Sequence, residues 1–428
     1  MMKKSDKFLQ DHKMSAADVD IQKVVDAFGS EMSNGLEGKE SSLQMIPTYI
    51  QADNTFITEM PVVAIDAGGT NFRAAKIRFD KDSNLEISNL VNARMPGIDR
   101  KVSKDEFFQT MAGYIKDLAD KSDRIGFCFS YATEILPNKD GRLIQFSKEI
   151  QAPEVVGELI GKNLLEALGT PDKQIVLLND TVATLLAGKS SSHVKNYDSY
   201  IGYILGTGTN TCYIESNKNI LKKPDLDPDK NQIINMETGN FGKGPRADLD
   251  IAFDNTTGTP GSYTFEKMFS GGYFGGLCLS VLKTAAKEDV FSGETANNIL
   301  SLDELTVEEL NRFVSQSTES REPLYSCMAN KEDEETCMGI IEGLIERSAK
   351  LVAANLSSVV LKTGKGKSAD RPILITIEGT TFYKLHKLKP LFEKHMNEYL
   401  SGEKQRYVEF NQVENSSLVG AALAALVE

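Results

Sequence analysis

The segment Pro61-Val-Val-Ala-Ile-Asp66-Ala-Gly-Gly-Thr70-Asn-Phe-Arg73 is an apolar run that breaks at a Gly–Gly–Thr turn. The same arrangement recurs where residues 200–205 meet Gly206-Thr-Gly-Thr-Asn210, and where residues 373–378 meet Gly379-Thr-Thr381. Glycine turns let backbone N–H groups approach a ligand closely and form anion-binding nests, and threonine hydroxyls add donors. Three such turns far apart in the chain predict one polyphosphate held from several sides. They indicate a nucleotide-dependent phosphotransferase.

The bulk composition excludes several classes of protein. At 428 residues the chain exceeds one typical core, which predicts two domains. No apolar stretch approaches the roughly 20 residues needed to span a bilayer, and the basic N-terminus has no apolar region behind it, so neither a membrane anchor nor a secretory signal is expected. The net charge of −13 disfavours nucleic acid and anionic lipid as partners.

The cysteines and histidines argue against disulfide, zinc and triad chemistry. There are five scattered cysteines without a Cys-x-x-Cys pair, and only four histidines without a His-Glu-x-x-His motif. We therefore expect a reducing, cytoplasmic setting. The sequence leaves a monomer and a homodimer equally open.

Strands and helices alternate along the chain, which indicates an α/β protein. Residues 61–79 predict a β-hairpin around the first glycine turn, 124–129 and 174–178 predict buried strands, and 418–426 predict a closely packed terminal helix. We expect residues 1–14 to be loose, a helix that ends near Gly35, and further helices at 109–120, 153–168, 301–311 and 332–355. The segment 302–330 suggests no chemistry.

Familiar phosphate motifs are missing. Gly188-Lys189-Ser190 and Gly366-Lys367-Ser368 end like a P-loop, but the glycine required five residues before each Gly-Lys-Ser is absent. Gly206-Thr-Gly208 begins like a dinucleotide fingerprint, yet Thr211 stands at the last glycine position and a strand follows.

Two aspartates follow predicted strands. Asp66 could orient a Mg²⁺-bound phosphate through water, because Mg²⁺ keeps its waters and uses few carboxylates; it could equally cap the turn. Asp180, after Asn179 at the start of a predicted helix, could be a general base, or the pair could be an ordinary helix cap.

The motifs together resemble the hexokinase family over nearly the whole chain. The matching segments, in the family's order, are Ser41 to Tyr49, Asp66 to Arg73, Phe129-Ser130-Tyr131 with Ser147-Lys148, Leu178 to Thr184, Gly206 to Tyr213, Asn235 to Gly242, Phe265 to Met268 with Ser270-Gly271, and Gly379 to His386. The resemblance implies a two-domain actin-like ATPase (ribonuclease H-like) fold, with small and large α/β domains flanking a cleft. It places the small domain at 60–178, completed by a C-terminal helix at 413–428, and the large domain at 1–59 and 179–412.

The resemblance also implies an activity: ATP-dependent transfer to the 6-hydroxyl of a D-hexose, as at the entry to glycolysis. Glucose is the favoured substrate, with mannose, fructose and glucosamine as other candidates, and MgATP is the donor. Asp180 would be the general base and Lys148 a catalytic cation that also contacts sugar. The remaining sugar ligands would be Ser130, Ser147, Asn179, Asn210, Glu237 and Glu266.

The nucleotide site follows from the same resemblance. Its members would be Asp66, Gly68, Gly69, Thr70, Asn71, Arg73, Gly206, Thr207, Gly379 and Thr380, with Asp66 reaching Mg²⁺ through water. Arg73 could instead pair with a local carboxylate.

Several positions depart from the family pattern near the sugar segments. Ala132 stands for a usual proline, Thr238 for tryptophan and Gly276 for glutamate, and Ser147 replaces threonine. These changes leave two alternatives open: a hexose-binding regulatory protein with little turnover, and a kinase for another hydroxylated substrate such as an amino sugar.

Overall fold

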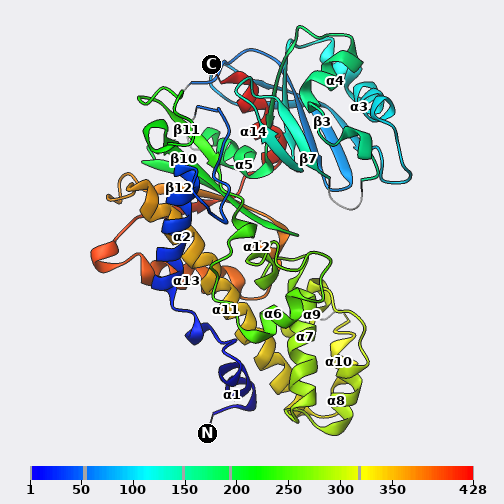
Figure 1. The fold of residues 1–428 in the computed structure, drawn as a ribbon, viewed down its shortest axis with the longest axis vertical. Helices are drawn as coiled ribbons and strands as arrows, with labels where there is room; N and C mark the ends of the chain where they lie inside the picture. The colour runs from blue at the N-terminus through cyan, green and yellow to red at the C-terminus, as the bar shows by residue number, and fades with distance from the viewer. Residues whose placement is uncertain (1, 52–54, 147–149, 192–194, 317–319, 428) are drawn as a thin grey trace.

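The computed structural model describes residues 2–51, 55–146, 150–191, 195–316 and 320–427. Two β-sheets, each covered by helices, form an elongated molecule in which the C-terminus lies in one lobe and the N-terminus at the far end of the other (Figure 1). The predicted α/β class is confirmed.

The first sheet has five strands in the order β4-β3-β2-β5-β8. β2 pairs antiparallel with β3 and β3 with β4, whereas β5 and β8 run parallel to β2. The bounds are β2 Val62–Gly68, β3 Asn71–Phe79, β4 Leu85–Arg94, β5 Arg124–Phe129 and β8 Gln174–Leu178; a ribbon of β6 (Ala132–Ile135) and β7 (Gly141–Gln145) follows β5.

Alternation along β2 divides its side chains between two cores, as the two-residue period of a strand requires. Val63 and Ile65 pack with α3 (Lys104–Ala119) and α4 (Ile160–Leu168), while Val62 and Ala64 pack with the terminal helix α14 (Ser416–Leu426). Both faces of the sheet are therefore covered, and this explains why β2 is a continuous apolar run.

The second sheet has six strands in the order β1-β11-β10-β9-β12-β13. Its bounds are β1 Ile46–Pro47, β9 Ser199–Leu205, β10 Thr209–Ser216, β11 Asn231–Asn235, β12 Ile373–Glu378 and β13 Val408–Asn411. Strands β9, β12 and β13 are parallel and the other pairings are antiparallel. The order β11-β10-β9-β12-β13 repeats the order and directions of β4-β3-β2-β5-β8. This repetition agrees with the idea of a duplicated core.

Two helices fill the space between the sheets. α5 (Asp180–Ser190) and α14 pack against each other, with α5 on β9 and α14 on β5 and β2. Glycines permit the close approach, because a Cβ on Gly420 would lie 2.1 Å from the Ala183 carbonyl oxygen and a Cβ on Gly126 would lie 1.8 Å from that of Ala421. The small residues of the terminal helix are thus explained.

A layer of helices covers the second sheet's other face. The long helix α11 contacts α2 and α13, and α6 to α10 lie beside its lower half in Figure 1. The bounds are α2 Ile21–Glu37, α6 Asp248–Asp254, α7 Phe274–Lys287, α8 Gly293–Leu300, α9 Val307–Val314, α10 Leu324–Cys327, α11 Lys331–Thr363, α12 Thr380–Lys384 and α13 Leu388–Tyr399. Within the described residues, no helix combines the length and the apolar character needed to cross a membrane.

Several local predictions were wrong. Residues 4–11 form helix α1 (Lys4–Asp11), whose Phe8 and Leu9 are buried against α11, where Gly343 leaves room for the Leu9 side chain. Helix α2 continues past Gly35 and ends at Glu37, because Gly38 is the glycine that adopts the left-handed conformation of a helix end. Gly35 has a different role, since its missing side chain leaves room for the Leu43 carbonyl oxygen. The helix expected at 301–311 begins only at Val307, after Thr306 caps it. The boundaries of the two domains stay a prediction.

We predict that Gly420→Ala destabilises the fold, since its Cβ would meet backbone atoms of α5 that cannot easily move. Overpacking of this kind costs about 1–3 kcal/mol, and the urea midpoint should fall. Gly113→Ala is the control, because Gly113 is an exposed position of α3 with open space around its Cβ. Alanine there should leave the midpoint unchanged or raise it; equal losses in both variants would contradict the packing argument.

Candidate active site

A cleft of about 980 Å³ lies where the ends of the strands of both sheets meet. The first two glycine turns face it, with Gly68, Gly69 and Thr70 from one sheet and Thr207 and Gly208 from the other. It brings together most of the residues singled out from the sequence: Asp66, Gly68, Gly69, Thr70, Asn71, Arg73, Ser130, Asn179, Asp180, Thr207, Asn210, Glu237 and Glu266. Ser147 and Lys148 lie outside the described residues.

Asp180 occupies the N-terminus of α5, directly after strand β8. The Thr181 N–H donates to Asn179 Oδ1 at 2.9 Å and to Asp180 Oδ1 at 2.8 Å, so both side chains cap the helix. Burial, together with the nearby charges of Asp66 and Glu237, raises the pKa of Asp180 to about 6 against the opposing hydrogen bonds from Thr181 and Ser130. The capping and general-base interpretations are therefore compatible, since a raised pKa suits a base that works near neutrality.

Two side-chain amides hold Glu237 in place. Asn210 Nδ2 donates to Asn235 Oδ1 at 2.7 Å and to Glu237 Oε1 at 3.3 Å, and Asn235 Nδ2 donates to Glu237 Oε1 at 2.8 Å. Asn179 Oδ1 joins the network 3.4 Å from Asn210 Nδ2. Glu237 has φ of 61°, an unfavourable left-handed conformation that the Asn210 side chain supports by accepting from the Glu237 N–H at 3.0 Å. Burial raises the pKa of Glu237.

Glu266 begins a short 3-10 helix, Glu266–Met268, and connects two loops. Its Oε2 accepts from the Thr209 N–H at 2.8 Å. Gly208 and Gly239 make room for the carboxylate, since a Cβ on either would lie 2.6 and 3.0 Å from Oε2 respectively. Burial, with the charge of Glu237, raises the pKa of Glu266 to about 7, while the Thr209 N–H and the charge of Lys267 oppose the rise.

The first glycine turn carries an ion pair. Arg73 Nε and Nη2 both donate to Asp66 Oδ2, at 3.0 and 2.6 Å, and Arg73 Nη1 donates to Asn415 Oδ1 at 3.3 Å. Arg73 therefore pairs with a local carboxylate, the alternative that the sequence left open. Among the described residues nothing donates to Asp66 Oδ1, so this oxygen stays available to a water-bound cation. No cluster of three or more metal-ligating side chains exists in the described part of the chain.

A second cavity of about 360 Å³ adjoins the cleft through Thr207, which lines both. Gly206, Thr380 and Thr381 also line it, and the Thr381 hydroxyl donates to the Gly206 carbonyl oxygen at 2.9 Å. Gly379, with φ of 114°, packs against the second turn, because a Cβ there would lie 2.2 Å from the Leu205 carbonyl oxygen. The three glycine turns thus converge, as their repetition predicted.

The structure adds residues that the sequence did not point to. Val307, Glu308, Asn311 and Arg312 of α9 line the second cavity, so part of the uninterpreted segment 302–330 belongs to the site. No sequence signal marked them. Asn235 began one of the segments that resemble the family but was not singled out as a site residue, although a polar residue at the end of β11, two positions before Glu237, suits a strand-end site.

The unusual sugar-side residues have local explanations. The buried Thr238 hydroxyl lies 3.3 Å from that of Thr211, which in turn accepts from Asn355 Nδ2 at 2.9 Å. A Cβ on Gly276 would lie 2.9 Å from the Phe253 ring, so that ring occupies the space of a larger side chain.

Comparison with known proteins identifies the class. Two hexokinase family models match residues 4–190 and 200–427, and the chain belongs to the hexokinase family of phosphotransferases. Among curated relatives, Hexokinase-3 of Oryza sativa subsp. japonica is 29% identical over 444 residues, covering 95% of this chain and 87% of the relative. Hexokinase-1 of Schizosaccharomyces pombe is 28% identical, with the same coverage of both chains. Human Hexokinase-3 is 28% identical, and the match spans 92% of this chain but 44% of that protein.

Solved structures confirm the fold. A hexokinase from Schistosoma mansoni complexed with glucose matches with a TM-score of 0.80 at 22% identity, covering 99% of this chain and 98% of that chain. A ROK hexokinase from Thermus thermophilus matches with a TM-score of 0.53 at 17% identity, covering 86% and 98%. The predicted actin-like fold and the hexokinase assignment are confirmed.

We predict that Asp180→Asn raises the melting temperature by a few degrees at pH 7.5. A carboxyl whose pKa is raised on folding costs stability once the pH exceeds its unfolded value, and the cost is complete above its folded pKa of about 6. Asparagine removes that cost and still accepts from Thr181.

Asp254→Asn is the contrasting variant. Burial would raise the pKa of Asp254, but hydrogen bonds from Lys267 and Gly261 and the charges of Lys267 and Arg246 hold it below its ordinary value. Such a group contributes stability above its unfolded pKa, so this variant should melt lower at pH 7.5. Calorimetry checks both, and a destabilised Asp180→Asn protein would contradict the electrostatic account.

Proposed function

We propose that this chain is an ATP-dependent hexokinase that phosphorylates the 6-hydroxyl of a D-hexose, with Asp180 as the general base. The observation that carries the proposal is the position of Asp180. Its carboxylate lies in one cleft with a network of amides and carboxylates and with two glycine turns. A base with a pKa of about 6 is largely ionised at neutral pH and can accept the hydroxyl proton as that oxygen attacks the phosphoryl group.

The polar network supports a polyhydroxyl substrate. Ser130, Asn179, Asn210, Glu237 and Glu266 offer donors and acceptors around Asp180, and several of them are held by one another before any ligand binds. A site built to hydrogen-bond hydroxyls strongly rejects analogues that lack them. Glucose is the first candidate, with mannose, fructose and glucosamine behind it. On the resemblance alone, Ser147 and Lys148 complete this subsite, with Lys148 stabilising developing charge.

The nucleotide is assigned to the two connected cavities. Adenosine would occupy the cavity lined by Thr380, Thr381 and α9, and the phosphates would run past Thr207 into the cleft between the glycine turns. Backbone N–H groups of such turns suit phosphate oxygens. Asp66 fits Mg²⁺, because Oδ1 has no donor among the described residues and Mg²⁺ prefers few carboxylates. The cation would neutralise phosphate charge when bound.

The lobes on either side of the cleft support a closure step. Because Ser130 directly follows β5 of one sheet, whereas Asn210 is in β10 of the other and Glu266 lies beside it, a sugar held by all three would contact both lobes at once. Binding would draw them together, exclude water from the γ-phosphate and so suppress ATP hydrolysis.

The deciding experiment is a coupled ADP-release assay with MgATP and a panel of hexoses, comparing wild type with Asp180→Asn. We expect hexose-dependent turnover that the variant lowers by orders of magnitude, while hexose still raises its melting temperature. Near-normal turnover in the variant would contradict the assignment of Asp180 as the general base. If wild type gained thermal stability from hexose but showed no turnover, it would be a hexose-binding protein instead.

The pH dependence of kcat/KM for the hexose provides a second test. We expect kcat/KM to decline as the pH falls through about 7, where Glu266 takes up a proton, and more steeply below about 6, where Asp180 does. Both groups act in the ionised form, so activity is present above these values and lost below them. Initial rates between pH 5 and 8 check this. A single decline centred near pH 4 would contradict it.

A further inference from the structure

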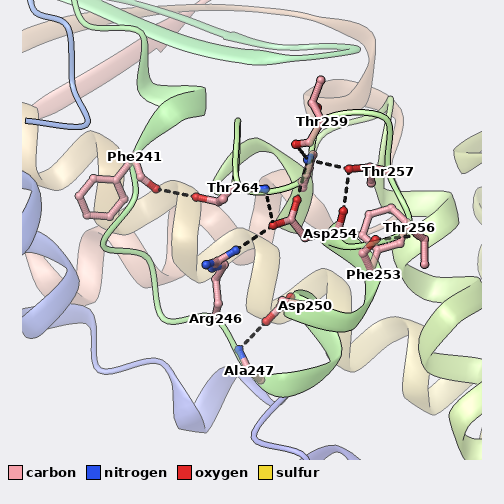
Figure 2. A network of polar contacts seen from close by, with 12 residues as sticks. Phe241, Arg246, Ala247, Asp250, Phe253, Asp254, Thr256, Thr257, Thr259 and Thr264 are labelled. Atoms are coloured by element: carbon pink, nitrogen blue, oxygen red, sulfur yellow. Dashed lines mark hydrogen bonds and ion pairs between the residues drawn. The ribbon is translucent and has the colours of Figure 1, made fainter.

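A buried ionic cluster lies behind the sugar subsite, around Asp254 of α6. Figure 2 shows Asp254 between Arg246 and the loop that carries Thr257 and Thr259. Asp254 Oδ2 accepts from Arg246 Nη1 at 3.0 Å and from the Gly261 N–H at 3.0 Å, and Oδ1 accepts from Lys267 Nζ at 2.6 Å. The Lys267 and Asp254 side chains are only 3% and 5% exposed.

The Lys267 ammonium is fully coordinated. Besides Asp254, it donates to the Thr257 hydroxyl at 2.8 Å and to the Thr259 carbonyl oxygen at 2.5 Å, which uses all three of its N–H bonds. Its own backbone N–H donates to the Tyr263 carbonyl oxygen at 3.1 Å. Lys267 thus ties the loop after α6 to the short helix Glu266–Met268.

Glu266 is the residue directly before Lys267 in that short helix. Its carboxylate reaches across to the Thr209 N–H, against Gly208 and Gly239, where a small displacement would break the contact. The next residues pack on the second glycine turn, since the Gly271 and Gly272 N–H groups donate to Gly206 and Thr207. Anchoring Lys267 therefore fixes the base from which Glu266 extends.

Stability alone gives a weak reason for such a cluster. Buried ion pairs are often no better than apolar residues of the same volume, because desolvation offsets the attraction. A fully satisfied polar network does specify one geometry, however. The charge of Lys267 also favours the ionised form of its neighbour Glu266.

We propose that Lys267, held by Asp254, is the positioning residue that fixes the Glu266 carboxylate for sugar binding. This rests on the proposed function, in which Glu266 accepts a sugar hydroxyl. Lys267 itself touches neither substrate nor nucleotide in this assignment. Among the residues that the structure describes, the other titratable groups that interact with Glu266 are Glu237, Tyr203, Tyr263 and Tyr273.

The test compares Lys267→Met with wild type in glucose binding by calorimetry and in steady-state kinetics from pH 5.5 to 8. We expect the glucose Kd and KM to rise on the order of tenfold, the loss expected for one hydrogen bond to a charged group. The KM for ATP should change less than about twofold, because the nucleotide contacts remain. The decline of kcat/KM at acid pH should move to higher pH, since Glu266 loses a neighbouring positive charge.

Arg347→Met is the matched control. Arg347 forms an equally buried pair with Asp250 of the same helix α6, at 2.7 Å, but does not contact the Glu266 loop. Arg347→Met should lower the melting temperature, as Lys267→Met does, but it should leave the glucose affinity unchanged. If Lys267→Met fails to fold, Asp254→Asn is measured in its place. Because this variant weakens the contact that holds Lys267, it should also raise the glucose Kd.

The outcomes separate the two proposals. The positioning role would be overturned if Lys267→Met kept the wild-type glucose affinity and pH profile. It would also be overturned if Arg347→Met lost as much glucose affinity as Lys267→Met. Either result would leave the hexokinase assignment intact. A wild-type chain that binds glucose without turnover would overturn the kinase reaction alone, and the Kd comparison would still test Lys267. A wild-type chain that neither binds nor phosphorylates any hexose would overturn both.

Discussion

The site depends on holding a carboxylate where it is costly to ionise. Asp180 is at the start of a helix packed between two sheets, close to Asp66 and Glu237, and burial raises its pKa to about 6. The Thr181 N–H and the positive end of α5 partly offset this cost. If water surrounded Asp180, its pKa would stay near the ordinary value for aspartate, and the carboxylate would be a weak base at neutral pH. The packing of α5 is therefore what turns this aspartate into a candidate base.

That packing is achieved with small residues. Gly420 of α14 meets Ala183 of α5, and Gly126 of β5 meets Ala421 of α14, so backbones touch where larger side chains would push the layers apart. The C-terminal helix thus completes a core that begins at β2. Because the same layer joins the elements on both sides of the cleft, a movement of one lobe must be accommodated at this contact.

The polar residues of the cleft support one another in two groups. Asn210, Asn235 and Glu237 form one, and Glu266 with Thr209 forms the other, anchored through Lys267 to the cluster around Asp254. In both groups hydrogen bonds hold a half-buried carboxylate, so its position is set before a ligand arrives. Such preorganisation is what phosphoryl transfer requires, since positioning and electrostatics do most of the work.

The amino-acid sequence was enough to predict the α/β class, the glycine turns, the family, the strand end at Asp66 and the helix start at Asp180. These features are local, because a strand followed by a Gly–Thr turn is encoded within about ten residues. Only the folded structure shows which residues are neighbours: Arg73 pairs with Asp66, Lys267 pairs with Asp254, α9 lies beside the Thr207 turn, and α1 packs on α11. The contacts of α9 and α1 join segments that are far apart in the chain, so no local pattern reveals them. Arg73 and Lys267 lie only 7 and 13 residues from Asp66 and Asp254, but the local sequence does not show which nearby carboxylate each one pairs with.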